Sequence, residues 1–408
     1  MDSNNTMFTE SNFASCKEHT ILSKLWEFIF AILFLYVFFA QNVFSSVSGM
    51  IIVFCGLSAI FWIANVLFIN NGSIRINYMF GIACFVIVSL IASFVCSNSL
   101  QDSLDVGFRM IEYLIIGCSL YAFITSYPQR FISIIRYMWL SITLLCIFVL
   151  FDGTEVTGAG AIGIKTLNVN LLSSYIMIHL LCGFILIGNT SRKIETIIYS
   201  SSIGITLFVQ ILSASRRGFI VACAFLLLAV VFGIIPRYAK KRIILKNFII
   251  ICLLIALVFI SDYVMNKTLL GQRFLGNFNT GDALRKVYHD IALREFLHNP
   301  IFGIGLNGLK SVMGVYSHSL YYETLSCTGL IGTAILVVSV FSLGLSLYKY
   351  SKRSTSNNVK DVYITKICFL FLGALLVAGI AVTTIYDFYF YICLAVMSSV
   401  VSINKRSK

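Results

Sequence analysis

The residues of this chain that could do chemistry gather in one polar stretch, residues 262–332, of an otherwise apolar sequence. Three of the five histidines lie there, and one of them, His318, belongs to the run Ser317-His318-Ser319-Leu320-Tyr321-Tyr322-Glu323. A neutral imidazole can accept a proton from a hydroxyl group, and arginine presents a planar fork of donors that fits phosphate oxygens. The sequence therefore predicts an active site that is roofed by this stretch, with Arg216 and Arg217 beneath it.

Arg216 and Arg217 lie between two apolar segments and mark their outer ends. An ionisable residue at membrane depth is costly, so it is expected to have a function. In the alternative interpretation both guanidinium groups extend to lipid phosphates, and this fits Arg217 better than Arg216. Because lysine and arginine are disfavoured on the outer side of a membrane, we expect Arg216 to act in catalysis and Arg217 to contact the substrate.

Arg285 and His289 are four residues apart, which places both on one face of a predicted helix. Arg285 and Arg216 together could clamp a pyrophosphate, whereas an ordinary solvated helix face is the alternative. His289 is a candidate for substrate contact because it shares the face of Arg285, although a surface histidine is the commoner case. We interpret His298 as a surface residue and His179, within an apolar segment, as a hydrogen-bonded packing residue.

His318 is the candidate acid or base, because it lies between two serines at the outer mouth of a helix that enters the membrane. Tyr322 follows at i+4 and shares the helix face of His318. Glu323 at i+5 points away from His318 in a regular helix, so we expect it to orient another group of the site. A purely structural histidine at a helix start is the alternative.

The composition identifies an integral membrane protein. Of the 408 residues, 59% are hydrophobic and only 12% are charged, and the mean hydropathy is +0.91. Too few polar residues exist to cover the surface of one soluble core. The residues before Ile21 are polar and contain no removable signal peptide, so the first apolar segment is expected to stay as an anchor. The twelve cysteines show no spacing typical of a disulfide framework or a zinc site, and no metal site is expected.

About twelve apolar segments approach the roughly 20 residues that a membrane-spanning helix needs. They are residues 24–42, 47–69, 77–96, 106–126, 132–151, 169–188, 197–213, 218–235, 247–262, 322–347, 367–384 and 387–403. With the N-terminus in the cytoplasm, 20 of the 30 basic residues but only 6 of the 17 acidic residues fall on the cytoplasmic side, as the positive-inside rule requires. This topology places both termini in the cytoplasm and explains the net charge of +13 without nucleic-acid binding.

The expected fold is all-α, with about 12 transmembrane helices in three parts. Residues 1–261 form an N-terminal transmembrane bundle of about nine helices, residues 262–321 form a large outer loop, and residues 322–408 form C-terminal transmembrane helices and a cytoplasmic tail. A loop of this length usually has a function. Apolar residues at helical spacing within 282–298, with Asn299-Pro300 as a stop, predict an amphipathic helix in the loop, on or near the membrane surface.

The order and spacing of several short motifs resemble the O-antigen polymerase and O-antigen ligase superfamily of bacterial envelopes. The motifs are Ser213-Ala-Ser-Arg216-Arg-Gly between two spans, Arg285 in the loop helix, His298-Asn-Pro-Ile-Phe-Gly-Ile-Gly305, and His318-Ser-Leu-Tyr-Tyr-Glu323 followed by Thr328-Gly329-Leu-Ile-Gly332. They extend from Leu212 to Gly332. Outside these residues, only the layout of twelve spans agrees with the superfamily.

The resemblance implies a GT-C-like glycosyltransferase of the bacterial inner membrane, with an active site that faces the periplasm. Its donor would be an oligosaccharide joined through pyrophosphate to undecaprenol, and it would need no metal or other cofactor. Arg216 and Arg285 would stabilise the departing pyrophosphate. His318 would position or deprotonate the acceptor hydroxyl, which attacks the anomeric carbon with inversion. Tyr321 and Tyr322, together with Tyr316, would offer surfaces for sugar rings.

Two activities of the superfamily stay open, and the resemblance is closer to Wzy-type polymerases, which join lipid-linked repeat units. Ligases transfer the glycan to lipid A-core and often have Asn after the shared histidine, where this chain has Ser319. Membrane lipids, and a chain-length regulator protein in the case of a polymerase, are the further partners to consider.

A flippase or transporter is a third interpretation, because twelve spans with both termini inside also describe such proteins. Transporters tend to have duplicated halves and charged residues near the middle of the membrane. The halves of this chain show no obvious duplication, and its unusual charges gather at the outer edge and in one large loop. These features favour an enzyme.

Overall fold

The computed structural model describes residues 20–44, 49–69, 77–97, 99–157, 161–163, 167–234, 262–264, 266–271, 278–352 and 359–406. Nearly all of this part of the chain is helical. A short antiparallel pair, β1 (Thr154–Thr157) and β2 (Ala161–Gly163), is the one sheet among the described residues. The expected class, an all-α integral membrane protein, is confirmed.

The main secondary-structure elements of the described part are α-helices. They are α1 (Thr20–Leu35), α2 (Gln41–Val43), α3 (Ile51–Ala64), α4 (Asn77–Cys96), α5 (Leu100–Ser126), α6 (Phe131–Asp152), α7 (Val169–Asn189), α8 (Lys193–Leu212), α9 (Arg216–Leu228), α13 (Phe278–His298), α14 (Gly308–Met313), α15 (Leu320–Ser351), α16 (Val359–Gly379) and α17 (Phe388–Arg406). The π-helical segments η3 (Tyr36–Ala40), η5 (Asn65–Ile69) and η7 (Ala229–Ile234) continue α1, α3 and α9, and the 3-10 turn η6 (Pro128–Arg130) precedes α6.

Nine helices of the described part are long and apolar enough to cross a membrane. They are Ile21–Val43, Tyr78–Cys96, Leu100–Ser126, Pro128–Asp152, Val169–Asn189, Lys193–Leu212, Leu320–Ser351, Val359–Gly379 and Phe388–Lys405. Each overlaps an expected span. The expected spans 47–69 and 218–235 correspond to α3 with η5 and to α9 with η7, and the span 247–262 lies almost entirely outside the described residues.

Two expected spans differ from the helices that the structure contains. α16 begins at Val359 and ends at Gly379 instead of covering 367–384, and residues 380–387 form a non-helical connection to α17. Hydropathy could not predict that α16 ends at Gly379, because the residues after Gly379 are also mostly apolar or small. α15 covers the expected span 322–347 but is interrupted at Gly329, where φ is 61° and ψ is −163°.

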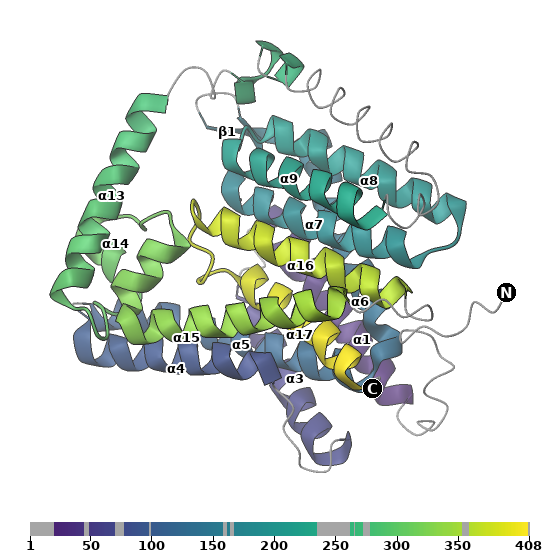
Figure 1. Cartoon of the computed structure of the whole chain (residues 1–408), viewed down its shortest axis with the longest axis horizontal. Helices are drawn as coiled ribbons and strands as arrows, with labels where there is room; N and C mark the ends of the chain where they lie inside the picture. Colours follow the sequence, from purple (N-terminus) through teal and green to yellow (C-terminus); the bar gives the residue numbers. More distant parts are fainter. Residues whose placement is uncertain are drawn as a thin grey trace.

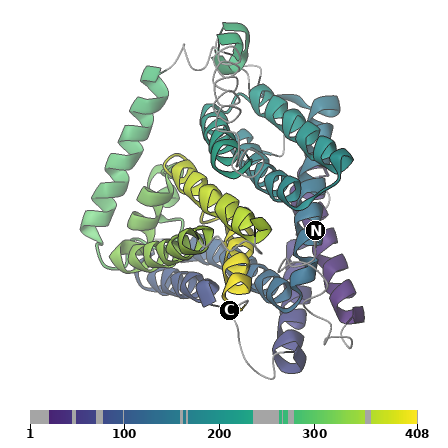
Figure 2. The same cartoon turned by 45° about the vertical axis from the view of Figure 1, so that its right-hand side comes forward.

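The spanning helices form one bundle, and α13 lies across one end of it, at the left in Figure 1. α14 and the first turns of α15 lie at this same end, and Figure 2 shows the same arrangement from another side. Within the bundle, α4 packs along α15, α5 packs along α17, and α7 contacts α6, α8, α9 and α16. The predicted helix at 282–298 is therefore confirmed as part of α13, which lies across one end of the bundle.

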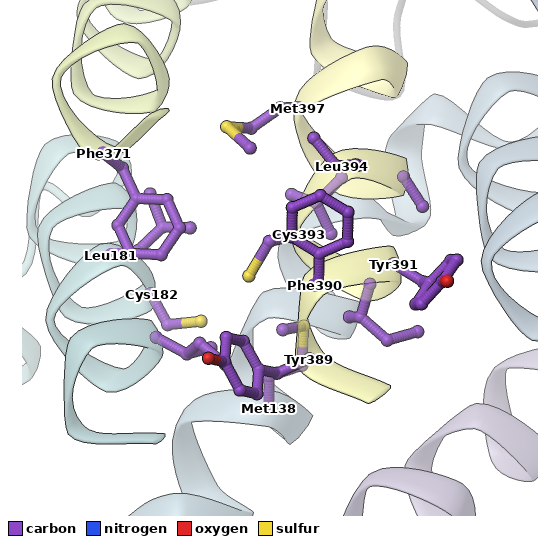
Figure 3. Close-up of a cluster of buried hydrophobic side chains, with 14 of the residues drawn as sticks. Met138, Leu181, Cys182, Phe371, Tyr389, Phe390, Tyr391, Cys393, Leu394 and Met397 are labelled. Atoms are coloured by element: carbon purple, nitrogen blue, oxygen red, sulfur yellow. The ribbon is translucent and has the colours of Figure 1, made fainter. Parts of the chain in front are cut away.

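α7 and α17 are the most buried spans among the described helices. Figure 3 shows side chains of α17 packed among those of α6, α7 and α16. The residues labelled there are Met138, Leu181, Cys182, Phe371, Tyr389, Phe390, Tyr391, Cys393, Leu394 and Met397, and each has no more than 2% of its surface exposed. The connection 380–387 directly precedes α17 and includes the exposed Ile380 as well as the buried Thr384 and Ile385.

Candidate active site

Arg216 is the first residue of α9 and follows a tight turn from α8. Ala214 in this turn has a φ of 51°, a left-handed conformation that is common where a helix ends. A Cβ atom at Gly218 would lie 2.4 Å from the Cβ atom of Ser173 in α7. Gly218 therefore lets α9 approach α7 closely. The motif Ser213–Gly218, which contains both Ala214 and Gly218, sets the position of Arg216.

Arg217 points into the protein. Its Nη1 atom donates a hydrogen bond to the carbonyl oxygen of Ala381, in the connection between α16 and α17. Its Nη2 atom is buried and has no partner among the described residues. Arg217 therefore holds this connection instead of extending to lipid phosphates, and a contact of Arg217 with substrate stays a prediction.

The loop segment after α13 is hydrogen-bonded into the break of α15. The backbone N–H of Leu330 donates to the carbonyl of Pro300 at 2.8 Å, and the N–H of Ile304 donates to the carbonyl of Ser326 at 2.9 Å. A Cβ atom at Gly329 would lie 2.3 Å from a carbonyl oxygen of the loop, so only glycine fits this crossing. The motifs His298–Gly305 and Thr328–Gly332 thus join α13 to α15, the helix that carries Tyr322 and Glu323.

α13 presents aromatic and basic side chains to the beginning of α15. The ring of His289 stacks on the ring of Tyr322, with centroids 4.2 Å apart and an angle of 11° between the planes. The ring of Tyr288 lies 6.1 Å from the ring of His318 at an angle of 45°. His289 and Tyr322, which the sequence placed on different elements, are therefore in direct contact.

His318 lies just before α15 and has a positive φ of 56°. The expectation that His318 and Tyr322 share a helix face is wrong, because the helix begins two residues after His318. A positive φ is uncommon for a residue with a side chain, and it turns the backbone sharply at this point. The His318 side chain is exposed, as an acid or base that meets a substrate must be.

Positive charges are concentrated where α13 faces α9 and α15. Burial, together with the charge of Arg216, lowers the pKa of Arg285. Burial, followed by the nearby Arg285 and His289, lowers the pKa of His318 from its ordinary value of 6.5, which favours a neutral imidazole at pH 7. The structure therefore brings Arg216, Arg285, His289 and His318 together, and this group suits an anionic ligand.

Glu323 is fully buried and holds the turn that contains His318. Its Oε2 atom accepts hydrogen bonds from the backbone N–H and the Oγ atom of Ser317, both at 2.8 Å. Its Oε1 atom accepts from Tyr386 at 3.4 Å. The interpretation of Glu323 as a residue of the substrate site that orients a group other than His318 stays a prediction.

Tyr321 and Tyr322 contact different helices. The hydroxyl of Tyr321 donates to the carbonyl of Leu376 in α16 at 2.8 Å, whereas Tyr322 stacks on α13. Tyr321 is 43% exposed. The contacts described here do not bring Tyr321 to the charged group, and its role as a sugar-binding surface stays a prediction.

The other two histidines of interest behave as the sequence predicts. His179 is fully buried, and its ring nitrogens lie 3.0 Å from the Oγ1 atom of Thr143 and 3.3 Å from that of Thr206. His298 is exposed at the end of α13. Neither is part of the charged group, and within the described part of the chain no three His, Cys, Asp or Glu side chains gather in a way that could hold a metal ion.

Sequence reasoning missed Lys310, Tyr386 and Asp387, which lie close to the charged group. The ring of Tyr316 lies 5.5 Å from the ring of Tyr386 and 5.4 Å from the Nζ atom of Lys310. Burial raises the pKa of Asp387 to about 7. An acidic residue at the outer edge of an apolar span was the available signal for Asp387, but the expected span boundaries left only two residues in this connection.

Fold and site together define a multi-pass, all-α membrane protein with a cationic site between an outer loop helix and the beginnings of α9 and α15. Residues 201–337, about a third of the chain, match the model of a family described as O-antigen ligase. The matched segment includes Arg216, Arg285 and His318. The match supports the O-antigen polymerase and ligase superfamily and does not distinguish a polymerase from a ligase.

Among solved structures, the chain is similar to one titled "Structural coordination of polymerization and crosslinking by a peptidoglycan synthase complex". The two chains share 15% sequence identity with a TM-score of 0.47, over 82% of this chain and 98% of the other. No curated protein matches the sequence.

Proposed function

We propose that this protein is a glycosyltransferase that joins oligosaccharide repeat units carried on undecaprenyl pyrophosphate, an O-antigen polymerase. Its active site then faces the periplasm from the inner membrane, and both termini lie in the cytoplasm. The similarity of residues 201–337 to the O-antigen ligase family supports the general reaction. The preference for a polymerase rests on Ser319 after His318 and on the motif around Arg216.

The observation that carries the proposal is the proximity of Arg216 and Arg285, which come from distant parts of the sequence. Their charges are close enough that Arg216 lowers the pKa of Arg285. Two like charges repel in the free protein, and a pyrophosphate would turn this repulsion into attraction. A leaving pyrophosphate gains negative charge as the glycosidic bond breaks, so the two guanidinium groups stabilise the transition state more than the ground state.

His318 completes the proposed reaction on the acceptor side. The acceptor hydroxyl oxygen attacks the anomeric carbon and forms the new glycosidic bond, while the bond from this carbon to the pyrophosphate oxygen breaks. The hydroxyl proton passes to the neutral imidazole of His318, and the electron pair of the broken bond leaves with the lipid pyrophosphate. The lowered pKa of His318 supports this role, because a base must be unprotonated at the working pH.

Three alanine variants test the proposed roles. Arg216→Ala, Arg285→Ala and His318→Ala should each reduce polymer formation by about a hundredfold or more, while the protein still accumulates in the membrane. Arg294→Ala is the matched control, because Arg294 is exposed on the same helix as Arg285. Near-normal polymer from one of the three variants would remove that residue from the catalytic machinery.

A ligase is the second candidate, because the match to the family described as O-antigen ligase is compatible with either activity. A silver-stained lipopolysaccharide gel from a host that lacks only this gene separates the two. Core that carries a single repeat unit means that ligation survives and polymerisation is lost. Bare core, with polymer retained on the lipid carrier, means that the protein is the ligase.

Purified protein in detergent separates an enzyme from a flippase. A glycosyltransferase should lengthen a lipid-linked glycan there, although no membrane divides two compartments. A flippase has nothing to move across under these conditions. Failure of elongation by well-folded protein, together with transport in sealed vesicles, would overturn the proposed enzyme activity.

A further inference from the structure

The connection 380–387, between α16 and α17, is hydrogen-bonded to α9, to α15 and to the loop before α14. Arg217, next to Arg216 in α9, donates to the carbonyl of Ala381. The hydroxyl of Tyr386 donates to Glu323 of α15 at 3.4 Å and accepts from the backbone N–H of Asn307 at 3.3 Å. The connection is therefore built into the outer end of the protein beside the proposed donor site.

Asp387, the last residue of the connection, is partly exposed and is oriented by hydrogen bonds. The hydroxyl of Tyr389 donates to its carboxylate, and the hydroxyl of Ser174 in α7 donates in turn to Tyr389 at 3.2 Å. Tyr316, two residues before His318, lies within electrostatic range of Asp387. Tyr316 therefore lies near Asp387 and belongs to the same loop as His318.

Several groups of different charge surround Asp387. Tyr113 of α5, Tyr175 of α7 and Tyr391 of α17 lie within its electrostatic range, in addition to Tyr316 and Tyr389. Arg109 and Glu112 of α5 interact with Tyr113, and Glu323 and Arg109 interact with Tyr316. The part of the site near the connection therefore combines carboxylates and tyrosines with the cations Arg109 and Arg217, whereas the part near Arg216 and Arg285 is cationic.

Unused hydrogen-bonding atoms lie on this connection and next to it. The Oγ1 atoms of Thr383 and Thr384 are buried and have no hydrogen-bond partner among the described residues, and the same holds for Nη2 of Arg217 and Oδ1 of Asn307. Thr384 is 1% exposed and Asn307 is 7% exposed. Buried polar atoms are nearly always paired in folded proteins. Four such atoms on adjacent segments indicate a place where a ligand with many hydroxyl groups completes the hydrogen bonds.

We propose that the connection 380–387 forms the acceptor subsite, in which Asp387, Thr383 and Thr384 bind the hydroxyl groups of the acceptor saccharide. This inference rests on the proposed function. A carboxylate repels the donor pyrophosphate but accepts hydrogen bonds from neutral sugar hydroxyls. The position of Asp387 therefore favours binding with the pyrophosphate toward Arg216 and Arg285 and the acceptor toward Asp387. The tilted rings of Tyr316 and Tyr386 provide an apolar surface for the sugar ring.

Asp387 acts here as a positioning residue, so its variants should change the apparent affinity for the acceptor. The purified protein is assayed with a lipid-pyrophosphate-linked repeat unit as donor and the free repeat-unit saccharide as acceptor. Asp387→Asn should raise the KM for the saccharide by about tenfold or more, the effect of losing one hydrogen bond to a charged group. The KM for the donor should stay unchanged, and Asp387→Glu should restore part of the acceptor affinity.

Matched variants distinguish a loss of acceptor binding from a loss of folding. Thr383→Val and Thr384→Val keep the side-chain shape and remove one hydroxyl each, so they should raise the acceptor KM several-fold without lowering protein yield. Asp262→Asn is the control, because Asp262 is an exposed acid of the outer loop that bonds to Asn266. An unchanged acceptor KM in Asp387→Asn and both threonine variants, or a rise in the donor KM instead, would overturn the inference.

Direct binding separates this inference from the proposed function. The free saccharide should raise the melting temperature of the wild-type protein and leave that of Asp387→Asn unchanged. If the wild type transfers no glycan but shows this difference in binding, the proposed polymerase activity fails and the saccharide site stands. If the wild type transfers glycan and both proteins are stabilised equally, the polymerase activity stands and the assignment of the acceptor subsite fails.

Discussion

His289 of the loop helix and Tyr322 of α15 are stacked with their ring centroids 4.2 Å apart and their planes only 11° from parallel. This contact joins the outer loop to the helix that enters the membrane. The Nε2 atom of His289 is buried and has no hydrogen-bond partner among the described residues. The stack therefore positions a histidine nitrogen, and with it the α13 face that carries Arg285, over the start of α15.

Loss of the stack should loosen the loop helix. Tyr322→Ala removes an aromatic contact worth about 0.5–1.5 kcal/mol beyond its buried area, so we expect faster proteolysis of the loop and reduced polymer formation. Tyr322→Phe keeps the stack and removes only the hydroxyl. Limited proteolysis of purified protein measures the difference, and equal cleavage of the two variants would show that the stack does not hold the loop.

The buried carboxylate of Glu323 should be needed for the turn at His318. Glu323→Ala leaves the buried N–H of Ser317 without its acceptor and leaves the Ser317 hydroxyl with only the carbonyl of Ser319, at a cost of about 1–3 kcal/mol for a buried group. We expect a lower melting temperature and a large loss of activity. Glu323→Gln retains one oxygen acceptor and should keep most of the stability. If Glu323→Ala melted with the wild type, the bonds seen at Ser317 would not stabilise the fold.

Lysine variants of Arg216 and Arg285 should show whether the site needs the planar guanidinium group or only a positive charge. Arg285→Lys and Arg216→Lys keep the positive charge but lose the planar fork that binds two oxygens at once, so both should remain far less active than the wild type. Inorganic pyrophosphate should compete with the lipid-linked donor in the wild type and lose this effect in Arg285→Ala. Lys286→Ala, a neighbouring exposed cation on α13, serves as the control. Equal inhibition of all variants by pyrophosphate would place the anion site elsewhere.

The activity should fall in two steps as the pH is lowered. Burial raises the pKa of Asp387 to about 7, so its carboxylate becomes protonated, and acceptor binding weakens, as the pH falls through about 7. The pKa of His318 is lowered below 6.5, so the imidazole stays neutral until the pH is lower still. A profile of kcat/KM for the acceptor should therefore lose its upper step in Asp387→Asn. Persistence of that step would assign it to another group.

Removal of divalent ions should leave the activity intact. In the proposed reaction the guanidinium groups of Arg216 and Arg285 supply the positive charge that a divalent ion would otherwise place on the leaving pyrophosphate. We expect equal rates of elongation with and without EDTA in the purified system. Loss of activity in EDTA that magnesium restores would contradict this part of the mechanism.

Much of the architecture was predictable because the membrane imposes simple rules. The lengths of the apolar segments predicted spans that overlap all nine described helices that are long enough to cross a membrane. The predicted helix stop at Asn299-Pro300 matches the end of α13 at His298. The ends of α15 and α16 were harder to predict. The break at Gly329 needs hydrogen bonds from a loop about thirty residues earlier in the chain, and hydropathy contains no information about such a contact.

The sequence by itself determined the class of the protein through its apolar spans, and it predicted arginines and a histidine near the ends of helices as residues of the site. These follow from local composition and spacing, which act through hydropathy and charge. The tertiary structure alone decided which residues meet. It brought Arg216 to Arg285, stacked His289 on Tyr322, and placed Asp387 beside Tyr316, because helices distant in sequence are packed together at one end of the bundle.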